Sequence, residues 1–184
     1  MTDPLTARAF LQGVDALTLA VTSGLDAEQR VREVIGHPVE ESTDDFDTAM
    51  DKGWLGAPNR VPIQFDSAPG GSILIEPNGY LMSAYAAEMT RSGGDLVSVY
   101  WQDATGRDTV TFARDGRLIR VFETYAREDA EGTPQPEEDG LPWDTDPRGA
   151  MVALVERIAL RRVTEDWLEH TARRTWMVVE PSRT

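Results

Sequence analysis

Apolar side chains recur at helical spacing in two stretches near the start of the chain. Steps of four, three and four residues predict a helix over Thr6–Val21. Its inward residues would be Phe10, Val14, Leu17 and Val21. Asp26 is a favourable N-cap, and it predicts a second helix that runs to Ile35 and ends at Gly36.

Helical spacing returns inside an acidic stretch and again near the end of the chain. Phe46, Ala49 and Met50 predict a short amphipathic helix with an acidic outer face. A later helix is predicted to begin at Arg148, and Thr164 is predicted to cap a short last helix. The inward residues of these two helices would be Met151, Leu154, Val155, Ile158, Trp167 and Leu168.

Strand-like spacing in the middle of the chain begins with a predicted hairpin. Residues 72–76 and 80–82 would pair across the Pro-Asn-Gly turn at residues 77–79. Proline presets the first turn position, and asparagine and glycine tolerate the left-handed geometry that closes it. Ser83 would then cap a short helix over Ala84–Arg91.

The clearest strands form a meander over residues 96–101, 107–114 and 117–125. The Asp115-Gly116 pair favours a two-residue type I′ turn, which fixes the register of the last two strands. In this register Arg114 opposes Arg117, Phe112 opposes Ile119, and Val110 opposes Val121. We expect the last four residues to share the buried face of the sheet.

Together these elements predict a single α+β domain, residues 1–184, with a mostly antiparallel sheet and N-terminal and C-terminal helices packed on it. Residues 1–55 would form a helical N-terminal part, and a strand at residues 175–180 would complete the sheet. Residues 128–147 read as an acidic, proline-rich loop, mobile for most of its length, with Trp143 pinning one end.

The formal net charge of −14 is local rather than spread over the chain. Two stretches without any base hold fourteen of the 32 acids, which leaves 18 acids against 18 Lys and Arg elsewhere. The first holds Glu40, Glu41, Asp44, Asp45, Asp47 and Asp51, and the second Glu128, Asp129, Glu131, Glu137, Glu138, Asp139, Asp144 and Asp146. Local acidity steers cationic partners. The candidate partner-binding residues are Asp44, Asp45, Asp47, Glu137, Glu138 and Asp139.

Few residues offer catalytic or cofactor chemistry. There is no cysteine, which excludes disulfides, thiolate nucleophiles and cysteine-based metal sites. His37 and His170 stand far apart, and no glycine-rich phosphate-binding motif is present, so we expect neither a metal nor a nucleotide cofactor. Glu76 beside Asn78 is a weak candidate for a catalytic acid, because turns collect such residues for conformational reasons.

Two further charged groups have a functional and a simpler interpretation. The aspartates at positions 44, 45 and 47 could attract calcium or magnesium, but they lack an EF-hand's glycine and glutamate, which favours a solvated acidic face. The last 37 residues hold seven arginines against five acids. Loose pairing with the acidic loop, at ~0–1 kcal/mol per exposed pair, is favoured over a phosphate-binding face.

Three motifs carry a resemblance to a known family. They are Ile-Leu-Ile-Glu-Pro-Asn-Gly-Tyr at residues 73–80, the Asp115-Gly116 turn, and Val-Thr-Glu-Asp-Trp-Leu at residues 163–168. In these the chain resembles an actinobacterial family of small proteins known as a domain of unknown function. The resemblance covers about the last two thirds of the chain. It implies the fold and a bacterial origin, and it implies no catalytic residue.

The sequence therefore predicts a non-enzymatic bacterial binding protein that meets a basic protein partner through its acidic segments. An immunity-type or other toxin-neutralising protein is one concrete form, and a nucleic-acid mimic is another; nucleic acid itself is disfavoured as a ligand. The alternative is an enzyme with an unrecognised carboxylate-based site. No signal peptide or membrane-spanning stretch is recognisable, so we expect a cytoplasmic protein that does not enter membranes.

Overall fold

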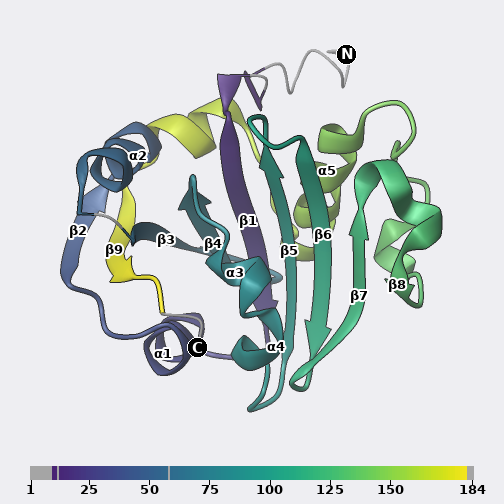
Figure 1. Ribbon diagram of the computed structural model, residues 1–184, viewed down its shortest axis with the longest axis horizontal. Coiled ribbons are helices and arrows are strands. Elements are labelled where there is room, and N and C mark those ends of the chain that lie inside the picture. The colour runs from purple at the N-terminus through teal and green to yellow at the C-terminus, as the bar shows by residue number, and fades with distance from the viewer. Residues whose placement is uncertain (1–9, 12, 58, 182–184) are drawn as a thin grey trace.

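The computed structural model describes residues 10–11, 13–57 and 59–181. In this part of the chain nine strands form one antiparallel sheet in the order β2-β9-β3-β4-β1-β5-β6-β7-β8 (Figure 1). The strands are β1 Ala16–Ser23, β2 Glu40–Asp44, β3 Arg60–Ala68, β4 Gly71–Pro77, β5 Asp95–Gln102, β6 Arg107–Arg114, β7 Arg117–Glu123, β8 Glu131–Gly132 and β9 Arg173–Val179. The predicted α+β class with a mostly antiparallel sheet is confirmed.

Helices cover both faces of this sheet. They are α1 Ala27–Val34, α2 Phe46–Leu55, α3 Leu81–Ala84, α4 Ala86–Met89 and α5 Pro147–Ala159, with short helical turns η2 Thr124–Asp129, η3 Pro136–Glu138 and η4 Asp166–His170. One core joins the sheet to α1, α3 and α4, and the other joins it to α2, α5 and η4. The finer prediction of a helical N-terminal part over residues 1–55 is not confirmed, because β1 and β2 lie there beside α1 and α2.

The predicted helix over Thr6–Val21 is wrong where the structure describes it. Residues 6–9 and 12 lie outside the described residues, and from Ala16 the chain forms β1. This strand lies between β4 and β5, and both of its faces are buried. A fully buried strand has no polar face, so its sequence loses the alternation that would distinguish it from a helix.

The predicted helix caps at Asp26 and Thr164 are confirmed. Asp26 caps α1 by accepting a hydrogen bond from the Gln29 N–H at 3.0 Å, and α2 forms over the predicted Phe46 region. α5 begins one residue before Arg148, and the Thr164 hydroxyl accepts a hydrogen bond from the N–H of Trp167 at 3.1 Å. Each of these capping hydrogen bonds joins residues three positions apart, so the local sequence is enough to predict it.

The predicted hairpin at residues 72–82 is wrong. β4 ends at Pro77, and residues 81–84 form α3 instead of a returning strand. The carboxylate of Glu76 accepts hydrogen bonds from the Leu81 and Met82 N–H groups, each at 2.7 Å, and so holds the start of α3. Ser83 lies inside α3, with its hydroxyl 2.8 Å from that of Ser98, and does not act as a cap.

The predicted meander is confirmed as β5, β6 and β7, but its register changes at a bulge. Asp115 and Gly116 both have positive φ, as the type I′ turn requires, and Arg114 opposes Arg117. The register then shifts between Phe112 and Ala113. As a result Phe112 opposes Arg120, Val110 opposes Phe122, and Thr111 opposes Val121. The expected pairings of Ile119 and Val121 are therefore wrong.

The strand predicted at residues 175–180 is confirmed as β9, which lies between β2 and β3. β2 itself has no counterpart among the predicted elements. Its sequence, Glu-Glu-Ser-Thr-Asp, carries no apolar residue, and it forms because it pairs with β9.

Candidate functional site

The second acidic segment, residues 128–146, has one carboxylate inside the protein. Glu138 is 2% exposed, and Arg120 of β7 donates to both of its oxygens, at 3.0 and 3.2 Å. The backbone N–H of Gln135 adds a third hydrogen bond at 2.7 Å. Glu138 thus has no oxygen to offer a partner, and we leave it out of the candidate surface.

Trp143 holds the same segment at a second point. Its ring is buried and meets the ring of Phe122 edge to face at 5.3 Å, and its Nε1–H donates to the carbonyl of Glu138 at 3.1 Å. The guanidinium of Arg127 lies 5.2 Å from the Trp143 ring. The segment is therefore attached to the sheet and α5, in contrast to the expected loop that is mobile for most of its length.

Most of the remaining acids of this segment are left without a counterion. In the described part of the chain six of its carboxylates form no ion pair and cap no helix. They are Glu128, Asp129, Glu131, Glu137, Asp139 and Asp144. Arg157 approaches them, but it donates to the carbonyl oxygens of Glu137 and Asp139, at 2.7 and 2.9 Å, and leaves both carboxylates free.

The expected pairing between the C-terminal arginines and this segment is largely absent. Within the described residues Arg157 is the one of the seven that contacts it by a hydrogen bond. Arg148 binds Asp103, while four others bind Asp66, Glu156, Glu28 and Glu41 or backbone carbonyls. Arg183 lies outside the described residues.

In the first acidic segment, residues 40–51, most carboxylates have a structural partner. Asp44 is buried and lies 3.0 Å from Nζ of Lys52, and this hydrogen bond raises the pKa of the lysine. Asp45 caps α2 through the Thr48 N–H at 2.8 Å, and its hydrogen bonds with Thr48 lower its pKa. Asp47 remains exposed on α2 and forms no ion pair in the described part of the chain.

Exposed apolar residues adjoin both acidic segments. Trp54 and Leu55, 65% and 86% exposed, end α2 one to two turns after Asp47 and Asp51. Leu55 also borders a groove of about 380 Å³ between α2 and the ends of β2, β3 and β9. On the second segment, Tyr125 is 71% exposed in η2.

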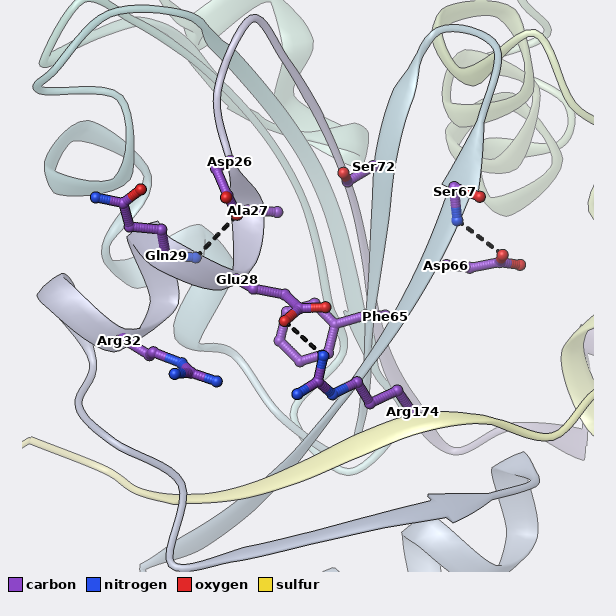
Figure 2. Close-up of a pocket in the computed structure, with 10 residues that line it drawn as sticks. All are labelled: Asp26, Ala27, Glu28, Gln29, Arg32, Phe65, Asp66, Ser67, Ser72 and Arg174. Atoms are coloured by element: carbon purple, nitrogen blue, oxygen red, sulfur yellow. Dashed lines mark hydrogen bonds and ion pairs between the residues drawn. The ribbon is translucent and has the colours of Figure 1, made fainter.

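A separate cavity of about 840 Å³ lies between α1 and strands β3, β4 and β9 (Figure 2). Its lining residues are Asp26, Ala27, Glu28, Gln29, Arg32, Phe65, Asp66, Ser67, Ser72 and Arg174. Figure 2 shows the side chains of Glu28 and Arg174 meeting beside the Phe65 ring, whereas Asp66 points away from it. No local motif predicted this cavity, because its walls come from four elements far apart in the sequence.

Two arginines of the cavity stack on one buried indole. The guanidinium groups of Arg32 and Arg174 lie 4.4 and 5.3 Å from the ring of Trp176. Arg174 donates to Glu28 at 2.8 Å and to Glu41 at 3.0 Å. The hydrogen bond from Arg174 lowers the pKa of Glu41.

Two carboxylates with raised pKa values lie outside these cavities. Burial raises the pKa of Glu76 to about 7, and the residue is fully buried with both oxygens bound to α3. Burial also raises the pKa of Asp108, beside Arg148. Neither residue lines the 840 Å³ cavity or the groove beside α2.

Within the described ranges, no three His, Asp or Glu residues are grouped as a metal site requires. His37 and His170 are both exposed. In the same residues no helix is long and apolar enough to cross a membrane. Comparisons with protein-family models, with curated proteins and with solved structures find no match to this chain.

Proposed function

We propose that the protein is a non-enzymatic bacterial binding domain that engages the basic surface of a protein partner through its acidic segments. The observation that supports this most directly is the set of six carboxylates on residues 128–144 that have no counterion among the residues the structure describes. Such a surface accelerates association with a basic partner and contributes to specificity.

The attachment of the second acidic segment also supports binding. Because Glu138 and Trp143 hold the segment against the sheet, little ordering entropy would be lost when a partner docks. The exposed Tyr125, and Trp54 with Leu55 beside the first segment, add apolar contact area next to the charges. Aromatic residues are enriched in protein–protein interfaces.

A toxin-neutralising protein is one concrete form of this function. Proteins that act on nucleic acids present basic surfaces to the phosphate backbone, and an acidic domain can cover such a surface. The same chemistry describes a nucleic-acid mimic. The alternative is a carboxylate-based enzyme, whose general acid would be a carboxyl of raised pKa in a cavity. Glu76 and Asp108 have raised pKa values but lie outside the two cavities described, which favours binding.

The test compares two triple variants that remove the same charge from different places. Glu128→Gln, Asp129→Asn and Glu131→Gln change the second segment, and the control set Glu165→Gln, Asp166→Asn and Glu169→Gln changes the η4 region. With a nona-arginine peptide as a basic probe, we expect the first triple variant to slow association and to flatten its salt dependence.

The control triple variant should leave both quantities close to those of the unmodified protein. Equal effects from the two sets would mean that only net charge matters and would contradict a defined surface. The same pair of variants then applies to any partner captured from the native host, with the association rate constant as the readout.

A further inference from the structure

The cavity in Figure 2 lies toward the end of the sheet opposite the second acidic segment, and most of its acidic groups are already occupied. Asp26 accepts the capping hydrogen bond of α1, and Glu28 is bound by Arg174 at 2.8 Å. Asp66 is held on the other side of the sheet by the Trp167 Nε1–H at 2.7 Å and by Arg161 at 3.3 Å. Each of these three carboxylates is therefore engaged by a donor of the protein itself.

Donor capacity remains on Arg32. Its single ion pair in the described part of the chain is with Glu41 at 3.9 Å, and Arg174 already binds that carboxylate at 3.0 Å. In Figure 2 its guanidinium extends toward Arg174. A guanidinium has five N–H donors in a planar fork that matches carboxylate and phosphate oxygens.

The hydroxyl groups of Ser67 and Ser72 add further donors on the β3–β4 side. Neither hydroxyl forms a hydrogen bond with any residue that the structure describes. Together with Arg32, these hydroxyls give the cavity donors that the described residues leave unused, and an anion would accept from them.

Phe65 supplies a flat apolar surface between these polar groups. Its half-buried ring packs edge to face on the ring of Trp176, with 4.7 Å between the ring centroids, and this contact fixes its position. Aromatic rings of a ligand stack or pack edge to face on such a surface. The volume, about 840 Å³, falls within the ~300–1,000 Å³ of small-molecule sites.

We propose that this cavity binds a small organic anion, a carboxylate or phosphate attached to a flat apolar group. The anionic group contacts Arg32 and the outer side of Arg174, and the flat group lies on Phe65. The site is distinct from the acidic surfaces, and its existence does not depend on the proposed protein partner.

Calorimetric titration with phenyl phosphate and with benzoate tests the site and separates the two anion types. Phenol, which lacks the anionic group, and inorganic phosphate, which lacks the ring, are the matched controls. We expect saturable binding of at least one aromatic anion, with phenol and inorganic phosphate each at least about tenfold weaker.

Three variants of cavity residues and one control variant locate the binding. Arg32→Gln should weaken the aromatic anion about tenfold or more, as the loss of a charged hydrogen bond predicts, while the exposed Arg91→Gln changes the same charge away from the cavity and should have no effect. Arg32→Lys keeps the charge without the planar fork, so its affinity for the aromatic anion should lie between those of Arg32→Gln and the unmodified protein. Phe65→Leu should weaken phenyl phosphate more than inorganic phosphate.

The proposal is overturned if neither aromatic anion binds saturably, if phenol binds as tightly as phenyl phosphate, or if the Arg32 and Arg91 variants behave alike. The two experiments are independent. A negative anion titration would not contradict the acidic binding surface, and a negative nona-arginine experiment would not contradict the anion site.

Discussion

Arg120 and Glu138 place two opposite charges in the interior beside Phe122 and Trp143. Burial of each charge costs desolvation energy, which close pairing and additional hydrogen bonds offset. Here the carboxylate accepts from Arg120 twice and from the Gln135 N–H once. The pair also joins β7 to η3, so it fixes the path of the second acidic segment.

Glu138→Gln should therefore destabilise the protein far more than the same change one residue earlier. The variant leaves the buried guanidinium without its counterion, and removal of one partner of such a pair costs about 3 kcal/mol. Glu137→Gln, on a carboxylate without an ion pair in the described chain, should change the free energy of unfolding by less than about 0.5 kcal/mol. Urea unfolding measures both, and equal losses would contradict the structural role of Glu138.

The burial of Arg120 also explains a limit of the sequence analysis at this scale. Without the bulge after Phe112, strand alternation assigns Arg120 to the partly buried face and Ile119 to the core face. One additional residue in β7 brings Arg120 opposite Phe112, while Ile119 stays partly buried against the same core. A bulge has no distinctive local composition in this strand, so sequence reasoning could not place it.

At the scale of elements, most predictions that rest on local chemistry agree with the structure, although the Pro-Asn-Gly hairpin and the Ser83 cap do not, and two strands that need distant partners were not predicted. The Asp26 and Thr164 caps and the Asp115-Gly116 turn involve residues within a few positions of one another. β1 and β2 owe their conformation to β4, β5 and β9. Tertiary pairing thus overrode helical spacing in β1 and low strand propensity in β2.

The connection between β3 and β4 gives an element-scale prediction. Gly70 donates its N–H to the carbonyl of Ala159 at 2.9 Å, and a Cβ at this position would overlap the carbonyl oxygen of Ile158. Gly70→Ala should force this turn away from the end of α5 and lower the free energy of unfolding by about 1–3 kcal/mol. Urea unfolding provides the measurement.

Gly13→Ala is the matched control, because a Cβ there meets no atom within 4 Å and its φ is not in the left-handed region. It should leave stability nearly unchanged. If both alanine variants are as stable as the unmodified protein, the close approach between the β3–β4 turn and α5 is not a constraint on the fold.

At the scale of the whole molecule, the sequence locates the acidic residues but does not show which of them remain available to a partner. Of the six candidate partner-binding residues, Asp44, Asp45 and Glu138 are engaged within the fold. Asp47, Glu137 and Asp139 keep carboxylates without counterions in the described chain. Sequence alone cannot separate the two groups, because Lys52 and Arg120, the charged partners of Asp44 and Glu138, come from other elements.

The free energy of unfolding depends on pH through all of these charges. One set of carboxyls lowers it as pH falls, and another lowers it as pH rises. Glu41 and Asp45 have lowered pKa values, so their contribution is present above the unfolded pKa and is lost as pH falls through the folded value. Glu76 has a raised pKa, so its contribution is complete below the unfolded value of 4.5 and is lost as pH rises through about 7. Stability should therefore decline on both sides of a maximum.

Glu76→Gln should remove most of the decline on the alkaline side. A change from 4.5 to about 7 corresponds to about 3 kcal/mol at ~1.4 kcal/mol per pKa unit. Between pH 4.5 and 8 the unmodified protein should lose about that much more unfolding free energy than the variant, whose amide cannot ionise. The variant itself should be less stable at pH 4.5, since its NH₂ group faces one of the two α3 N–H donors that the carboxyl now accepts. Urea unfolding at a series of pH values gives both curves. Parallel curves would mean that Glu76 ionises in the folded protein as readily as in the unfolded chain, which would contradict its burial beneath α3.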